Sequence, residues 1–279
     1  MNGCRATFMV CRLQILLLVI VGLGAVEPLR IGISDPICHD SACSCVGDGA
    51  VRSYAGVLAR LEQRGIPTSV RYFEDPILLE RQVAAGTVDV LVCKAWDGWQ
   101  AALAAKRAFT RIADVSRPDG STGLRGVFLV RSDAPLRILA SLAGRTVAVG
   151  NESGYEKSVL ARGTLERAGV VPGKIVELGA CSELALAVKE RTVDAAVVSD
   201  YAVEQGCVVV VGTKDDFRTI ATTDRAIPFV SVFAADSLDA GLRQRLTAEL
   251  LAMQGAAVPA GLDSAGFVAA VPWQPGSER

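Results

Sequence analysis

Residues Ser141–Gly154 read SLAGRTVAVGNESG, and this stretch decides the fold class. A β-rich run, Thr146–Val149, lies between two glycine-containing turns, and the second turn opens a helix expected over Ser153–Ala168. A strand that passes through a tight turn into a helix is half of a parallel strand–helix–strand unit. The stretch therefore predicts an α/β fold.

The same order of elements occurs twice along the chain. Residues 64–90 contain a helix end, Gly65, a strand, a helix and a second strand, and residues 168–195 repeat that order with Gly169 at the helix end. Glycine is favoured just after a helix because it adopts the left-handed conformation without steric cost. Two copies predict two equivalent lobes, each a mainly parallel sheet flanked by helices. We expect lobe one to comprise residues 27–122 plus 211–279, and lobe two residues 123–210.

The first 25 residues have the pattern of an export signal. Arg5 and Arg12 form a basic start, and the apolar run Leu13–Leu23 has about half the length that a membrane-spanning helix needs. Gly24 offers a small residue for cleavage. The pattern favours a signal peptide over residues 1–25 above a membrane anchor, and leaves open whether it is cleaved. We therefore expect the protein in the periplasm or outside the cell.

Composition argues against nucleic acid and against catalysis. The 29 Lys and Arg residues balance 30 Asp and Glu residues, and no basic run is interleaved with aromatic residues. His39 is the single histidine, and G-x-S-x-G, P-loop and H-E-x-x-H motifs do not occur. The sequence predicts a binding protein rather than an enzyme.

Candidate ligand-binding residues follow from the position of the turns. In open α/β sheets, ligands bind beyond the carboxyl ends of the strands, so two facing lobes place their strand-to-helix turns around one cleft. Helix amides at Ser153–Tyr155 are expected to favour an anionic group, and Trp96 to pack on an apolar or cationic part of the ligand. The expected cleft residues are Ser34, Asp35, Lys94, Trp96, Asp97, Asn151, Glu152, Ser153, Tyr155, Ser199, Asp200 and Tyr201.

Four segments together resemble one known family. The quoted stretch, the preceding GLRGVFLVRSDAPLRILASL, and the later VDAAVVSDYAVEQG and FRTIATTDRAIPF are similar to phosphonate- and phosphite-binding subunits of ABC transporters, over residues 29–253. The resemblance implies the type II periplasmic-binding-protein fold. It also implies an extracytoplasmic protein that captures a small solute of the phosphonate or phosphate class between two lobes, with a membrane permease as partner.

The turn after the strand departs from that family. Phosphonate binders carry Ser and Thr there, whereas this chain reads NESGYEK, and two carboxylates near an oxyanion would repel it. Glu156 is expected to form a capping box with Ser153. Glu152 is either exposed or directed toward the ligand. Lys94 and Lys157 either compensate the charge or lie solvated at the surface.

The segment CHDSACSC, Cys38–Cys45, is absent from ordinary phosphonate binders. Three thiols and one imidazole within eight residues could ligate a soft metal ion, although C-x4-C-x-C matches no zinc-ribbon spacing. Export permits disulfides instead, and free thiols are the third alternative. No cofactor is certain from the sequence, and the candidate metal ligands are Cys38, His39, Cys43 and Cys45.

This cluster supports two alternative functions on the same fold. One is a periplasmic metal- or thiol-linked accessory protein that no longer serves a transporter. The other is an enzyme, because the fold also occurs in the pyrimidine synthases of thiamine biosynthesis, some of which have a dense cysteine motif. Those enzymes are cytoplasmic, so the export signal opposes this alternative.

Overall fold

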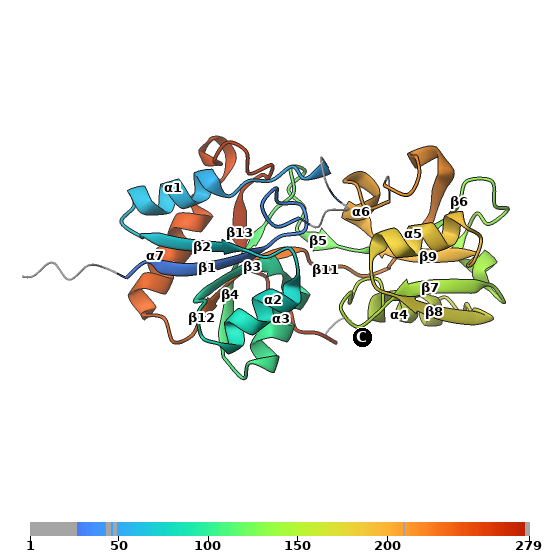
Figure 1. The fold of residues 1–279 in the computed structure, drawn as a ribbon, viewed down its shortest axis with the longest axis horizontal. Helices are drawn as coiled ribbons and strands as arrows, with labels where there is room; N and C mark the ends of the chain where they lie inside the picture. Colours follow the sequence, from blue (N-terminus) through green and yellow to red (C-terminus); the bar gives the residue numbers. More distant parts are fainter. Residues whose placement is uncertain (1–26, 43–45, 47–48, 209, 277–279) are drawn as a thin grey trace, which may run out of the picture.

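The computed structural model describes residues 27–42, 46, 49–208 and 210–276, which form two lobes joined at a narrow junction (Figure 1). The predicted signal peptide, residues 1–25, lies outside the described residues. Among the described residues, no helix is long and apolar enough to cross a membrane.

Lobe one is a six-stranded sheet covered by helices on both faces. Strands β1, β2 and β3 pair in parallel, and β12 runs antiparallel between β3 and β4. The strands in spatial order are β13 (Phe267–Ala269), β4 (Phe109–Val115), β12 (Val230–Ala235), β3 (Val90–Lys94), β1 (Leu29–Ser34) and β2 (Thr68–Tyr72). The helices are α1 (Ala55–Gln63), α2 (Pro76–Ala84), α3 (Ala95–Ala104) and α7 (Ala240–Leu251), with a 3₁₀ turn at Gly255–Ala257.

Alternation along β3 explains why both faces of this sheet are covered. Val90 and Val92 belong to one buried cluster together with residues of α1 and α7, whereas Leu91 and Cys93 belong to another with residues of α2 and α3. Successive strand side chains point to opposite faces, so a strand that is apolar at every position must be buried on both sides. The carboxyl end of β3 is thereby fixed rigidly at the edge that faces lobe two.

Lobe two is a five-stranded sheet in which β9, β7 and β8 pair in parallel, whereas β6 and β10 are added antiparallel on the other side. The strands in spatial order are β10 (Phe217–Thr222), β6 (Gly126–Arg131), β9 (Ala195–Ser199), β7 (Thr146–Gly150) and β8 (Lys174–Leu178). The helices are α4 (Val159–Arg167), α5 (Cys181–Lys189) and α6 (Asp200–Glu204), with 3₁₀ turns at Leu139–Leu142 and Lys214–Asp216.

Two short strands connect the lobes. Strand β5 (Gly123–Leu124) pairs antiparallel with β11 (Ile227–Pro228), so the outgoing and returning chains lie side by side (Figure 1). The sequence placed the return near residue 211, and this boundary is wrong because β10 pairs with β6 in the sheet of lobe two. The alternation of Phe217–Thr222 identifies a strand but not the neighbour with which it pairs.

The helix predicted from Ser153 begins only at Val159. Residues between β7 and α4 form consecutive turns, because Asn151 accepts the amide of Ser153 on its side chain at 3.1 Å and the amide of Gly154 on its carbonyl at 3.1 Å. Such local bonds compete with helix formation. The predicted capping box of Ser153 with Glu156 is therefore wrong, and two of the three amides expected to face an anion are already bonded.

Candidate functional site

A cavity of about 280 Å³ lies where the strand ends of the two lobes meet. Several expected residues line it, namely Ser34, Lys94 and Asp97 from lobe one and Ser153 and Tyr201 from lobe two. Lys157 also lines it from lobe two. The cavity is therefore built from the turns after strands of both sheets, where a ligand could contact both lobes.

The acidic rim of this cavity was not anticipated from the sequence. Glu74, Asp75 and Glu80 line its edge and come from the turn after β2 and the first turns of α2. Asp75 also caps α2, because its carboxylate accepts the amide of Ile77 at 2.9 Å. Ligands bind beyond the carboxyl ends of parallel strands, and the carboxyl end of β2 lies at the same sheet edge as those of the other parallel strands. The same rule could therefore have selected the turn after β2.

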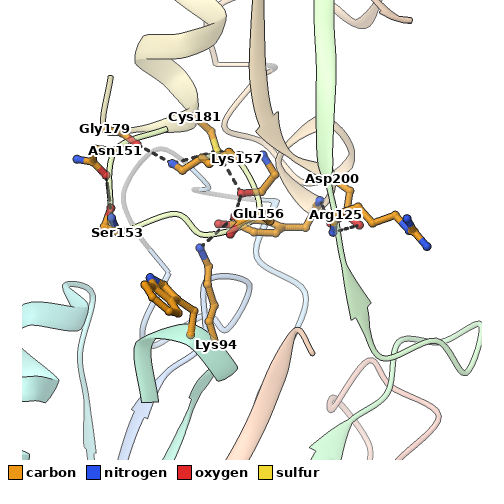
Figure 2. Close-up of polar contacts among 12 residues, drawn as sticks. Lys94, Arg125, Asn151, Ser153, Glu156, Lys157, Gly179, Cys181 and Asp200 are labelled. Carbon is orange, nitrogen blue, oxygen red and sulfur yellow. Dashed lines mark hydrogen bonds and ion pairs between the residues drawn. The ribbon is translucent and has the colours of Figure 1, made fainter. Parts of the chain in front are cut away.

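Lys94 is the central cation of the junction. It is the last residue of β3, and its Nζ lies 3.8 Å from a carboxylate oxygen of Glu156 (Figure 2). The same Nζ lies 5.5 Å from the ring centroid of Tyr201. Burial acts to lower the pKa of Lys94, but the acidic groups of Tyr201, Glu156 and Asp97 outweigh it and raise the pKa well above its usual value. Lys94 therefore stays charged inside the junction.

Glu156 is the carboxylate that faces Lys94 from lobe two. Its side chain is 1 % exposed and accepts a hydrogen bond of 2.5 Å from the Ser199 hydroxyl. Burial acts to raise its pKa, but Lys94, Lys157 and the Ser199 hydroxyl together lower it. A buried carboxylate with these partners is ionised at neutral pH, so Lys94 and Glu156 form an ion pair between the lobes.

Lys157 lines the cavity, and its side-chain stem packs against two glycines. Its Nζ donates to the carbonyl of Gly179 at 2.5 Å and lies 3.9 Å from the Cys181 sulfur (Figure 2). A Cβ at Gly150 or Gly154 would lie 2.4 Å or 2.2 Å from the aliphatic stem of Lys157. The glycines on either side of Asn151–Ser153 thus allow the lysine stem to pass beside the backbone.

Asp97 lies in the first turn of α3 and is 9 % exposed. Among the described residues its carboxylate has no hydrogen-bond partner, although Lys94, Glu156 and Lys157 act on it through their charges. Burial is the largest influence and raises the pKa of Asp97 to about 6, against the opposing effect of Lys94. The cavity therefore contains a carboxylate that accepts a proton near neutrality.

Two expected ligand-binding aromatics contact each other across the lobes. The ring centroids of Trp96 and Tyr155 are 4.6 Å apart, and Trp96 Nε1 donates to the carbonyl of Glu152 at 3.0 Å. Trp273 packs edge-on against Tyr155, whose hydroxyl accepts the amide of Gly276 at 2.9 Å. These residues join the lobes beside the cavity and do not line it.

Asp35 forms buried hydrogen bonds with other residues of lobe one. Its carboxylate accepts from Arg52 Nη1 and the Tyr54 hydroxyl, each at 2.7 Å, and all three side chains are buried. This network fixes the segment after β1 and does not line the cavity.

Asp200 is bonded to residues of the hinge and does not line the cavity. Its carboxylate accepts from the amide of Arg125, directly after β5, at 3.2 Å (Figure 2). It also accepts from Arg117, which precedes β5, at 2.7 Å. It therefore connects α6 of lobe two to the crossing point of the chain.

The cysteine segment is described in part. Cys38 is a buried free thiol, whereas the neighbouring His39 is exposed. Cys43 and Cys45 lie outside the described residues, and among the described ones no group of three or more His, Cys, Asp and Glu side chains is placed to hold a metal ion. The metal, disulfide and free-thiol alternatives for Cys43 and Cys45 stay predictions.

Two lobes joined by paired hinge strands, with a cavity lined from both, define a two-lobed periplasmic binding protein of type II. The family described as "ABC transporter, phosphonate, periplasmic substrate-binding protein" matches residues 48–274. The chain belongs to this family. No curated protein matches it.

Solved structures share the fold at low sequence identity. PhnD1 from Prochlorococcus marinus, in complex with methylphosphonate, is 16 % identical with a TM-score of 0.64, over 87 % of this chain and 92 % of that one. A binding protein component of an ABC phosphonate transporter from Pseudomonas aeruginosa is 15 % identical with a TM-score of 0.61, over 88 % and 82 %. A Xanthomonas citri protein bound to chloride ion is 20 % identical with a TM-score of 0.62, over 90 % and 93 %. These similarities confirm the predicted fold.

Proposed function

We propose that this protein captures a small oxyanion of the phosphonate or phosphate class between its lobes and delivers it to a membrane permease in the periplasm. The observation that carries the proposal is that Lys94 from lobe one and Lys157 from lobe two line one cavity. Closure would bring both cations onto one anion, which is how lobe movement is coupled to ligand binding. Binding of this kind requires no catalytic group.

The hydrogen-bonding state of Lys94 supports an anionic ligand. Among the described residues, Lys94 Nζ makes only the ion pair with Glu156 and the contact with the Tyr201 ring, and it makes no hydrogen bond. An ammonium group has three donors, so Lys94 can donate to a phosphonate oxygen in the cavity. The methylphosphonate bound by the Prochlorococcus relative provides a natural first probe.

Isothermal titration calorimetry with methylphosphonate and inorganic phosphate tests this function. We expect the wild type to bind at least one probe and Lys94→Met to lose binding, because an apolar side chain leaves the oxyanion without its cation. Lys174→Met is the matched control, because Lys174 is an exposed lysine at the start of β8. Equal binding by both variants would exclude Lys94 from the site.

Native mass spectrometry of protein from its own compartment identifies the natural solute. A retained oxyanion supports transport of this class. Metal analysis of the same sample tests the hypothesis that Cys38, His39, Cys43 and Cys45 hold a soft metal ion, since the thiolate ligands would retain it.

A further inference from the structure

The carboxylate of Glu156 occupies the junction in the manner of a bound anion. It lies 3.8 Å from Lys94 of lobe one and accepts a hydrogen bond from the Ser199 hydroxyl of lobe two (Figure 2). Lys157 adds a second positive charge from the same turn. The two cations that we assign above to the solute, Lys94 from lobe one and Lys157 from lobe two, here already act on a carboxylate of the protein.

The ion pair exists only when the lobes are together. Lys94 ends a strand of lobe one, and Glu156 lies in the turn between β7 and α4 of lobe two. The same turn supplies the Glu152 carbonyl to Trp96 and the Tyr155 ring to Trp96 and Trp273. Groups of the protein itself therefore hold the lobes together through one turn.

A solute oxyanion on Lys94 would meet this carboxylate. Lys94 lines the cavity and its Nζ lies 3.8 Å from the Glu156 carboxylate, so an anion that binds Lys94 from the cavity brings a second negative charge to the same ammonium. Like charges repel strongly in a buried site, so one of the two anions has to move away.

We propose that Glu156 is a specificity-determining residue that competes with the solute: its carboxylate binds Lys94 and joins the lobes, and an oxyanion binds by displacing it. The proposal rests on the function proposed above. It implies that an anion must interact with Lys94 and Lys157 more strongly than a carboxylate does. Weak oxyanions would fail this requirement and would be rejected.

The sign of the effect of Glu156→Gln on affinity tests the competition. Glutamine keeps the shape and can still accept from Ser199, but it removes the charge that acts on Lys94. If the solute displaces Glu156, calorimetry should show methylphosphonate binding roughly tenfold more tightly, because a like charge no longer opposes it. If the carboxylate stays beside the solute and assists closure, affinity should fall, and an unchanged or weaker affinity overturns the proposal.

The matched control is Glu166→Gln, which removes one exposed carboxylate from α4 of the same lobe. We expect its affinity for methylphosphonate to equal that of the wild type. An equal gain in both variants would mean that the net charge of the lobe, not competition at Lys94, sets the affinity, and would overturn the proposal.

Small-angle X-ray scattering without added solute tests independently whether the Glu156 carboxylate joins the lobes. Glu156→Gln should have a larger radius of gyration than the wild type and Glu166→Gln, because the ion pair between the lobes is lost. If Glu156→Gln does not fold, Lys94→Gln removes the same pair and should expand equally. An unchanged radius overturns the proposal. This measurement tests whether Glu156 joins the lobes even if no variant binds methylphosphonate, an outcome that would contradict only the proposed function.

Discussion

Asp97→Asn should stabilise the protein at neutral pH. Asp97 is 9 % exposed, and burial raises its pKa from the ordinary value of 3.8 to about 6. A group whose folded pKa is raised binds more protons in the folded state, so its ionisation lowers stability as pH rises between these two values. A shift of about two pH units corresponds to roughly 3 kcal/mol of lost unfolding free energy above pH 7.

Asparagine removes this cost at every pH. Relative to the wild type, we expect Asp97→Asn to gain about 3 kcal/mol in unfolding free energy at pH 7.5 and only about 1 kcal/mol at pH 4.5, where the folded wild type is already protonated. Urea unfolding followed by circular dichroism at the two pH values measures both gains. Asp215→Asn, at an exposed position, is the control and should gain nothing. A gain of equal size at both pH values, or a loss at pH 7.5, would refute the reasoning.

Asp35→Asn should lower the unfolding free energy by about 3–5 kcal/mol, because the buried guanidinium of Arg52 loses its carboxylate; a urea midpoint equal to that of the wild type would contradict this. Gly98→Ala should cost about 1–3 kcal/mol, because the added Cβ would lie 2.5 Å from the Phe233 ring; a thermal scan that shows no decrease would count against the packing of α3. Thiol titration should find four buried cysteines unreactive in the folded protein and reactive in urea, namely Cys38, Cys93, Cys181 and Cys207. Fast labelling of any of them before unfolding would contradict their burial.

Local signals in the sequence were sufficient to predict the two repeated strand–helix units. Gly65 and Gly169 were expected to follow helices, and they have φ of 71° and 66° after α1 and α4. The run Val90–Cys93 is apolar at every position, the pattern of a strand that packs on both faces, and it forms β3. Such features depend on neighbours in the chain, so sequence alone reveals them.

Features that depend on distant partners were missed. The alternation of Phe217–Thr222 indicates a strand but not its pairing with β6, because alternation carries no information about the neighbouring strand. Glu156 matched a capping box by spacing, and the competing bonds of Asn151 moved the helix start to Val159. The ion pair of Glu156 with Lys94 joins a turn of lobe two to a strand of lobe one, and no local pattern could indicate it.

The site residues were predicted best where the end of a strand alone places a side chain at the cavity. Ser34, Lys94, Asp97, Ser153 and Tyr201 line the cavity as the topological rule requires. The rule names turns, however, and cannot say which side chain in a turn is used internally. Several expected ligand-binding residues instead have side chains that are hydrogen-bonded inside the protein, among them Asp35, Asn151, Ser199 and Asp200.

The pairing of β5 with β11 has a consequence for the order of assembly. Everything in the sheet of lobe two lies between these strands in one uninterrupted stretch, whereas the sheet of lobe one needs β12, which follows them. Chains are made from the amino terminus, so lobe two has all its strands before lobe one does. A chain that stopped after Ala226 would contain the complete sheet of lobe two, but in lobe one β4 would lack both of its partners, β12 and β13, and only β1, β2 and β3 could pair.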